Sequence, residues 1–424
     1  MSLTTEQLAI RGGPPVHQGP WVPGFHGSEE FAEEEKEAVL RVLEKKRVFR
    51  FLTSGIEDSE AARLEEAYRG LVGRGFALAV NSGTAALVTA LVGAGVGPGD
   101  EVIVPAYTYI ATAAAVIAAR AVPVICEVDS SLNMDPAELE RKITSYTKAV
   151  IPVHMRGVPA RMDEIMAVAQ RRGLTVIEDV SQANGGRYRG RMLGAIGDLG
   201  CFSLQQYKVI TAGEGGVVVT NDQGLYQRCL MAHDSAIRFW KSDAEIPSFP
   251  SENYRLSELS AALALAQFGR MSSILERTRA TKARIVAQIR DAPGIELQDV
   301  PDPAGDCGIA LILFCRSADL AKQFSAALKA EGIPNGTMYD NTIADRHIYR
   351  NWDYVLAKRG ATPINCPWSC GAYKGNVAYS PDMCPRSLDY LGRAISIGIS
   401  QRMEPEHADK IATGVQKVAR ALLG

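Results

Sequence analysis

Short apolar segments alternate with longer helical stretches over the first two thirds of the chain. Segments rich in apolar and β-branched residues predict buried strands at 76–80, 101–104, 122–126, 149–153, 174–178 and 215–220. The stretches between them have helical patterns, such as the amphipathic segment Met162–Arg172. Strands that are apolar along their whole length must be covered on both faces. The pattern therefore predicts an α/β fold with a mostly parallel sheet between two layers of helices.

The pattern changes near residue 290, where turn-forming residues such as Pro293, Gly294, Pro301 and Pro303 gather. Around this turn we expect two consecutive helices, a strand, a further helix and a C-terminal helix, at 257–271, 273–289, 308–314, 318–331 and from 404 onward. A chain of 424 residues also exceeds one ordinary hydrophobic core. We therefore expect a large domain over residues 1–290, with an N-terminal arm, and a smaller C-terminal α/β domain over residues 291–424.

The composition is that of a soluble globular protein, with 46% hydrophobic and 22% charged residues. The net charge of -2 offers no electrostatic attraction to nucleic acid or to an anionic membrane. No apolar run approaches the roughly 20 residues that a membrane helix needs. The first 13 residues lack the basic and then apolar regions of a signal peptide. We therefore expect a cytoplasmic protein without nucleic-acid or membrane partners.

The eight cysteines form no C-x-x-C pair, and several lie inside apolar segments. This distribution is typical of buried, reduced thiols in a cytoplasmic protein. Cys366 and Cys370 flank a short loop, but no second pair completes a metal site there. We expect no metal ion.

Lys208 is the first candidate for chemistry, because it lies between the apolar segment that ends at Ser203 and the glycine-rich turn 213–216. Apolar neighbours on both sides favour burial of its stem. A buried ammonium loses its proton readily, and the neutral amine condenses with an aldehyde. The alternative is a solvated lysine on a surface loop.

Asp179 lies at the carboxyl end of a predicted buried strand, where an unpaired carboxylate is costly. A pyridinium nitrogen is one partner that would stabilise it, and a carboxylate there lets the ring act as an electron sink. A helix N-cap and a metal ligand are the alternatives. Gln182, three residues later, can hydrogen-bond a phenolic oxygen of the same ring.

Two further segments follow predicted strands at the same edge of the sheet. Gly83 and Thr84 open a helix whose first N–H groups suit a phosphate, and Ser203 reaches the same phosphate if the fold brings it close. Ordinary helix capping is the alternative. Tyr107 and Tyr109 leave another strand, and one of them can stack on a planar ring, with packing beneath a loop as the alternative.

Taken in chain order, these segments resemble the DegT/StrS family of sugar aminotransferases, which belong to fold type I of the enzymes that use pyridoxal 5'-phosphate (PLP). The resemblance runs most clearly from Phe51 to Met271. The matching segments are 81–87, 99–109, 153–154, 178–179, 202–203, Lys208, 213–216 and 253–258. It implies the aspartate aminotransferase-like fold, with a seven-stranded, mostly parallel sheet and a smaller α/β domain.

The resemblance also implies a role for each matching residue. Lys208 would hold PLP as a Schiff base and move the proton, and Asp179 would pair with the pyridine nitrogen. The other implied cofactor contacts are ring stacking by Tyr109, a hydrogen bond from Gln182 to the phenolic oxygen, and phosphate binding by Gly83, Thr84, Ser203 and, from a neighbouring subunit, Asn253. The expected substrate contacts are Arg50, Tyr107, His154 and Tyr339, each with packing in the core or at the surface as the alternative.

The implied activity is transfer of an amino group from L-glutamate or L-glutamine to a keto or aldehyde group of a sugar or cyclitol. The reaction would be ping-pong, through pyridoxamine phosphate, in a homodimer with shared active sites. An aromatising enzyme for an aminodehydroshikimate-type substrate and a transaminase for an eight-carbon sugar acid are the alternatives within the family. A non-catalytic regulator on the same fold is the alternative from another class, and the presence of both Lys208 and Asp179 argues against it.

Overall fold

The computed structural model describes residues 7–24, 26–52, 58–240, 248–338 and 344–424. A seven-stranded sheet forms the centre of the molecule, in the order β1-β9-β8-β5-β4-β2-β3. Its strands are β1 (Phe76–Val80), β2 (Glu101–Pro105), β3 (Val122–Cys126), β4 (Thr147–Val150), β5 (Thr175–Asp179), β8 (Leu199–Ser203) and β9 (Gly216–Thr220). Only β9 runs antiparallel to its two neighbours. The predicted α/β fold with a mostly parallel, seven-stranded sheet is confirmed.

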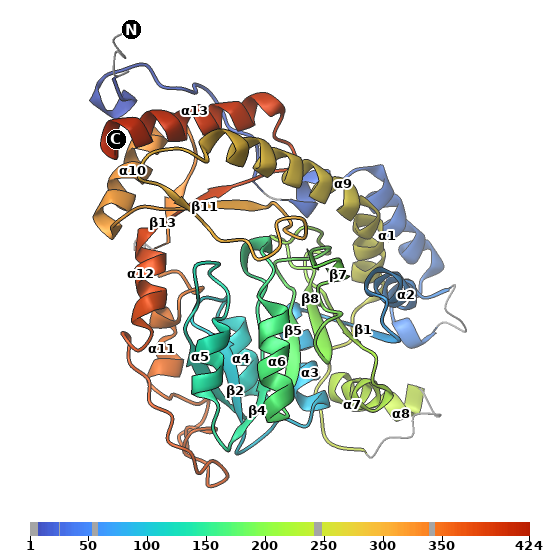
Figure 1. Ribbon diagram of the computed structural model, residues 1–424. Helices are drawn as coiled ribbons and strands as arrows, with labels where there is room; N and C mark the ends of the chain where they lie inside the picture. The colour runs from blue at the N-terminus through green and yellow to red at the C-terminus, as the bar shows by residue number, and fades with distance from the viewer. Residues whose placement is uncertain (1–6, 25, 53–57, 241–247, 339–343) are drawn as a thin grey trace.

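Helices cover both faces of this sheet (Figure 1). One core contains residues of α3 (Gly83–Gly93), α4 (Ala111–Ala118) and α7 (Gln223–His233). The other core contains residues of α2 (Glu60–Val72), α5 (Pro136–Lys142), α6 (Met162–Arg172) and the first half of α9 (Glu258–Ile289). Strand β1 shows why both faces must be apolar, since Leu78 packs into the first core and Ala77 into the second.

Strand β8 is the one strand of this sheet that the hydrophobic pattern did not predict. Its sequence has glycine and serine among its apolar residues. Gly200 is required by packing, because a Cβ there would lie 2.5 Å from the Cα of Gly194. A close approach between two backbones therefore interrupts the apolar pattern on which the prediction depended.

A second sheet of four antiparallel strands lies beyond the end of the large one (Figure 1). Its order is β10-β11-β13-β12, with bounds Glu296–Leu297, Ala310–Phe314, Ala394–Gly398 and Gly336–Thr337. Helices α10 (Ala318–Ala330) and α13 (Pro405–Leu422) share its core with the last turns of α9. The two helices expected at 257–271 and 273–289 are wrong, because one continuous helix, α9, spans both. Serine has only a modestly lower helix propensity than alanine, so Ser272 and Ser273 do not end the helix.

Each of the two sheets packs against segments that come from the other end of the chain. Leu8 packs in the core of the small sheet, and the buried carboxylate of Glu331 accepts hydrogen bonds from the backbone of Ala9 and the amine of Lys417. In the other direction, α11 (Asp353–Leu356) and α12 (Pro385–Arg393) contribute to the first core of the large sheet. The division of the chain at residue 290 stays a prediction.

The remaining elements lie at the periphery. Helices α1 (Glu33–Lys45) and α8 (Ile237–Trp240) lie on the right-hand side of Figure 1, and β6 (Arg187–Tyr188) pairs with β7 (Arg191–Met192). Within the described ranges, no helix has the length and apolar character that a membrane crossing requires.

Glu258 ties α9 to the start of α2, and its loss should destabilise the fold. Its buried carboxylate accepts hydrogen bonds from Ser59 Oγ at 3.0 Å and from the backbone N–H groups of Glu60 and Ala61 at 2.5 and 3.3 Å. We expect Glu258→Gln to lower the free energy of unfolding by ~1–3 kcal/mol. Urea denaturation measures this. The exposed Glu276 on the same helix provides the control Glu276→Gln, and equal effects of both variants would contradict the prediction.

Candidate active site

The carboxyl ends of the parallel strands bring the predicted residues to one edge of the large sheet. Asp179 ends β5, Tyr107 follows β2, and Lys208 lies on the loop that joins β8 to β9. Helix α3 begins directly after β1. In open α/β sheets this edge is where ligands bind.

The loop that carries Lys208 is fixed by its own backbone. Leu204 N–H donates to the carbonyl of Gly215 at 2.8 Å, and Lys208 N–H donates to that of Gln205 at 3.0 Å. Val209 and Ile210, which follow the lysine, are buried. Burial lowers the pKa of Lys208 below its usual value; the carboxylate of Asp179 opposes this, and the charge of Arg156 lowers the pKa further. The amine is therefore biased toward the neutral form that can act as a nucleophile.

The carboxylate of Asp179 is 4% exposed and lies close enough to Lys208 to influence its charge. Its Oδ2 accepts from Thr112 Oγ1 at 2.9 Å, and its Oδ1 accepts from the N–H of Ser181 at 3.0 Å. These bonds fix the position of the carboxylate in a buried place. Each carboxylate oxygen accepts about two hydrogen bonds, so capacity remains for one more donor.

Gly83 and Ser203, which were predicted to share a phosphate, lie directly against each other. A Cβ on Gly83 would lie 2.6 Å from Cβ and 2.8 Å from Oγ of Ser203, so only glycine fits. Ser82 caps α3 by accepting from the N–H of Ala85 at 3.0 Å. Thr84 is exposed beside this turn. The free N–H groups of the first turn and these side chains form a cradle of the kind that binds phosphate.

Arg156 is a residue of this site that the sequence interpretation missed. It lies in a short turn after β4 with φ 54° and ψ 28°, a left-handed conformation that costs a non-glycine residue roughly 1–3 kcal/mol. Its Nε donates to the hydroxyl of Tyr107 at 3.2 Å, and its backbone N–H donates to Oε1 of Gln182 at 3.2 Å. Gln182 therefore keeps its amide N–H groups for another acceptor. The sequence signal for Arg156 was its position, as a basic residue, just beyond the strand predicted at 149–153.

Tyr109 lies at the open side of the site with a 48% exposed side chain. Its ring centroid is 5.2 Å from that of His347, whose Nδ1 is 2.7 Å from Oδ1 of Asp345. Burial lowers the pKa of His347; Asp345 opposes this, and Arg156 and Lys208 lower the pKa further. The segment around His347 thus faces the same compartment as Lys208.

Three of the expected substrate contacts, His154, Arg50 and Tyr107, are buried in this structure, and their contact with substrate stays a prediction. His154 is fully buried, its Nε2 is 3.1 Å from a carboxylate oxygen of Glu178, and its Nδ1 accepts from the N–H of Ala160 at 3.1 Å. Both ring nitrogens are therefore used inside the core. Arg50 is also buried, and its Nη1 and Nη2 each donate to the carboxylate of Glu65 at 2.8 Å. Tyr339 lies outside the described residues.

Asn253 is exposed, and its Oδ1 accepts from the N–H of Arg255 at 3.2 Å. Its backbone forms an antiparallel bridge with Asp234, whose carboxylate pairs with the guanidinium of Arg255 at 2.6 Å. Within the described part of the chain, no hydrogen bond joins Asn253 to Lys208, Asp179 or Ser203. Its predicted role at a neighbouring subunit stays a prediction.

The N-terminal segment lies directly on the lysine loop. Gly27 N–H donates to the carbonyl of Lys208 at 3.2 Å, and a Cβ on Gly27 would lie 2.8 Å from the Cα of Ile210. The absent side chain is therefore what allows the two backbones to meet. No sequence pattern pointed to this contact.

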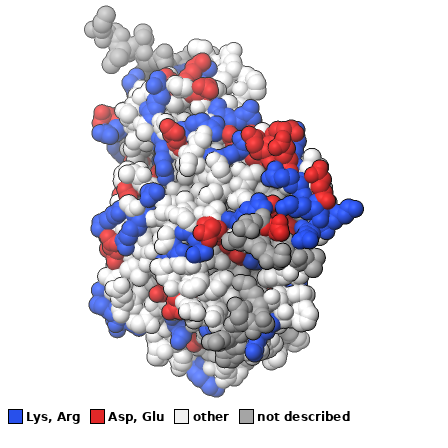
Figure 2. Space-filling view, turned by 90° about the vertical axis from the view of Figure 1, so that its right-hand side faces the viewer, with Lys and Arg blue, Asp and Glu red and all other residues white. Residues whose placement is uncertain are grey.

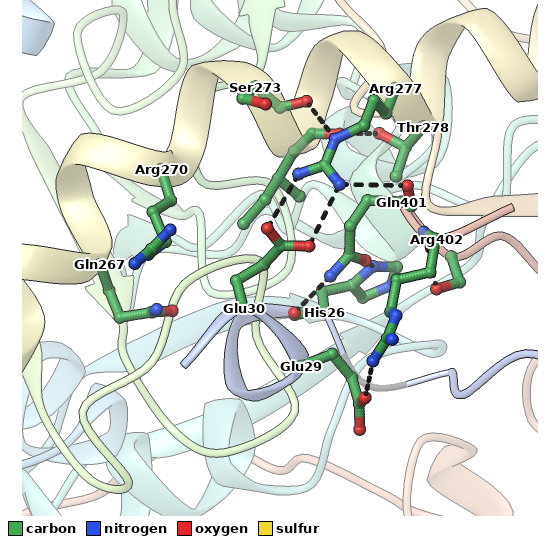
Figure 3. Close-up of polar contacts among 12 residues, drawn as sticks. His26, Glu29, Glu30, Gln267, Arg270, Ser273, Arg277, Thr278, Gln401 and Arg402 are labelled. Carbon is green, nitrogen blue, oxygen red and sulfur yellow. Dashed lines mark hydrogen bonds and ion pairs between the residues drawn. The ribbon is translucent and has the colours of Figure 1, made fainter. Parts of the chain in front are cut away.

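Figure 3 shows how this segment is held between α9 and the loop that precedes α13. Gln401 Nε2 donates to the carbonyl of His26 at 2.6 Å. Glu30 pairs with Arg277 at 3.0 Å, and Glu29 pairs with Arg402 at 2.9 Å. The backbone of Lys208 is thereby linked, through residues 26–30, to the chain that leaves the small sheet.

The residues at this edge fit PLP. The Gly83–Ser203 cradle suits the phosphate, Asp179 keeps a free acceptor position, and the amine of Lys208 is close to Asp179. Over the part of the chain that is described, no three His, Cys, Asp or Glu side chains gather as a metal site would require. A fold and site of this kind define PLP-dependent enzymes of fold type I.

The chain belongs to the DegT/DnrJ/EryC1/StrS aminotransferase family, whose model matches residues 30–364. It is 42% identical to GDP-perosamine synthase of Caulobacter vibrioides over 229 residues, which are 52% of this chain and 58% of that protein. It is 31% identical to the spore coat polysaccharide biosynthesis protein SpsC of Bacillus subtilis, over 84% of this chain and 89% of that protein. The predicted family and enzyme class, a PLP-dependent aminotransferase, are confirmed.

Solved structures agree with this assignment. DesV of S. venezuelae, in complex with a ketimine intermediate, superposes with a TM-score of 0.77 at 30% identity, over 95% of this chain and 99% of DesV. Synthase for 3-amino-5-hydroxybenzoic acid superposes with a TM-score of 0.76 at 24% identity, over 95% of this chain and 99% of that one. The second likeness shows the fold alone.

A methyl group at position 83 should weaken cofactor binding. Gly83→Ala forces the turn of α3 away from Ser203, so we expect the affinity for PLP to fall about tenfold or more, as for loss of a charge-assisted hydrogen bond. A spectroscopic titration of the PLP-free protein measures this. Gly70→Ala on α2 is the control, because a Cβ there meets no atom within 4 Å. Unchanged affinity in Gly83→Ala would refute the cradle.

Proposed function

We propose that this protein transfers an amino group from L-glutamate or L-glutamine to a keto or aldehyde group of a sugar or cyclitol. The observation that carries the proposal is the half-buried amine of Lys208, with a lowered pKa, close to the buried carboxylate of Asp179. The names of the two relatives, a perosamine synthase and a spore coat polysaccharide protein, support a sugar as the amino acceptor.

PLP, when bound, supplies a carbonyl carbon that captures the amino group and a ring that spreads negative charge. The chain's own residues divide the remaining work. Asp179 would accept a hydrogen bond from the protonated ring nitrogen and so keep the proton there. Gln182 donates from Nε2 to the phenolic oxygen, because its Oε1 is already used by Arg156. Tyr109 would cover one face of the ring and limit the access of water.

Lys208 has two tasks in this proposal. Its neutral amine holds the cofactor in the resting enzyme, and burial keeps a larger fraction of that amine neutral. Once released from the cofactor, Nζ would be the group that accepts and returns the proton of the substrate carbon that carries nitrogen. The bonds within the loop and from Gly27 keep the amine within reach of both carbons.

We also propose a homodimer whose two sites share residues. Apolar side chains are exposed on α1 and near α8, with Leu40, Leu43 and Phe239 at 53%, 50% and 80%. On the face shown in Figure 2, which includes this side of the molecule, charged residues surround a broad uncharged area. Large apolar side chains that gather at an exposed surface, such as these three, are typical of subunit contacts. The exposed Asn253 is then free to reach the phosphate site of the partner.

Replacement of the lysine should abolish the reaction. In Lys208→Ala no other described amine lies beside Asp179, so we expect turnover with L-glutamate and a keto sugar to fall at least about a thousandfold. A coupled assay for 2-oxoglutarate measures it. Lys148→Ala, at an exposed position of β4, is the control and should keep wild-type turnover. Substantial activity in Lys208→Ala would overturn the proposed function.

Shared sites can be tested with hybrid dimers of two inactive variants. If Asn253 serves the partner, an unfolded and refolded equal mixture of Lys208→Ala and Asn253→Ala subunits regains about a quarter of wild-type activity, because half of the dimers have one intact site. If Asn253 serves its own subunit, no hybrid site is intact. Activity no higher than the sum of the two parents, with a dimer seen by analytical ultracentrifugation, would rule out sharing.

A further inference from the structure

The guanidinium of Arg156 is only partly used by the protein. Its Nε is taken by the hydroxyl of Tyr107 at 3.2 Å, and that hydroxyl lies 3.3 Å from the sulfur of Met338. Across the described ranges, Arg156 has no ion pair, and neither Nη atom has a hydrogen-bond acceptor. The side chain of Arg156 is half-buried, so solvent reaches only part of it.

Tyr107 and, at longer range, the carboxylate of Asp345 raise the pKa of Arg156, so its guanidinium stays charged in this half-buried place. Its charge lowers the pKa of both Lys208 and His347, which places all three groups in one compartment. The nearby carboxylates are already engaged, because Asp179 accepts from Thr112 and Ser181, and Asp345 pairs with His347 at 2.7 Å. A buried or half-buried arginine normally has an anionic partner. Among the described residues Asp345 acts on Arg156 only at longer range, so Nη1 and Nη2 remain available to an anion from solution.

The geometry also restricts the shape of that partner. The left-handed backbone and the bond from Nε to Tyr107 set the direction of the side chain. The guanidinium edge that Tyr107 leaves free presents Nη1 and Nη2. These two donors together match the two oxygens of a planar carboxylate. A lysine at this position would present a single point charge without this match.

We propose that Arg156 binds a carboxylate of the reacting molecules through Nη1 and Nη2, and so selects an acidic substrate. The inference rests on the proposed function, since it concerns the same site. Two molecules can supply the group: the amino donor, whose carbon skeleton carries carboxylates, or an acceptor that is itself a sugar acid. Arg156 is in either case a specificity-determining residue, held in place by Tyr107 and Gln182.

Isothermal titration calorimetry with three probes tests this inference. Glutarate represents the donor skeleton without its amine, D-glucuronate represents a sugar acid, and D-glucose is the uncharged comparison. We expect Arg156→Met to weaken binding of at least one anion by about tenfold or more, because charge-assisted bonds are lost. Binding of D-glucose should not change. Loss for glutarate assigns the donor, and loss for D-glucuronate assigns an acidic acceptor.

The control is Arg316→Met, at an exposed arginine after β11, which should bind all probes as the wild type does. The inference is overturned if Arg156→Met binds both anions with wild-type affinity, or if the wild type binds neither. It is also overturned if the variant loses affinity for PLP instead, since Arg156 would then serve the cofactor phosphate.

Titrations with and without PLP separate this inference from the proposed function. If the wild type fails to develop the absorbance of bound PLP, the proposed function fails. The anion titration of the PLP-free protein still decides the role of Arg156 in that case. If PLP binds normally and the anions do not distinguish Arg156→Met from the wild type, only the inference about Arg156 fails.

Discussion

A lysine amine held partly out of water, beside a buried carboxylate, is the constraint on which the site depends. The fold meets it at the carboxyl edge of the large sheet, where β5 delivers Asp179 and the β8–β9 connection delivers Lys208. That connection has no helix, β9 runs antiparallel to β8, and the lysine lies in a loop fixed by its own backbone. Apolar neighbours on this loop lower the pKa of the amine, and Asp179 limits that fall.

The rest of the chain supports this edge from several directions. The cradle formed by Gly83 and Ser203 exists because no Cβ separates helix α3 from β8. Gly27 approaches the lysine loop for the same reason, and the contacts among Glu30, Arg277 and Gln401 connect it to the small sheet. A short series of hydrogen bonds therefore connects the backbone of Lys208 to the chain that leaves the small sheet.

Much of the fold could be predicted because most strands of the large sheet are apolar throughout. Strand β8 is not apolar throughout, because its packing against Gly194 requires a glycine at position 200. Lys208, Asp179, Gly83 and Ser203 could be proposed for one site because they lie at or just after the ends of strands, and such ends meet at one edge. Arg156 and Gly27 were missed because a left-handed turn and a close contact between backbones leave no periodic signal. The substrate contact expected of His154 stays a prediction, because its position after a strand does not tell whether the side chain faces the site or the core, and here it lies beside Glu178.

One measurement tests the central claim most directly. Borohydride reduction of the PLP-loaded protein fixes the cofactor to the amine that holds it, and peptide mass spectrometry then locates the label. The structure predicts a single modified peptide that contains Lys208, obtained in lower yield when Asp179 is replaced by alanine. A label on another lysine, or no label at all on a folded protein, would contradict the assignment of this edge as the active site.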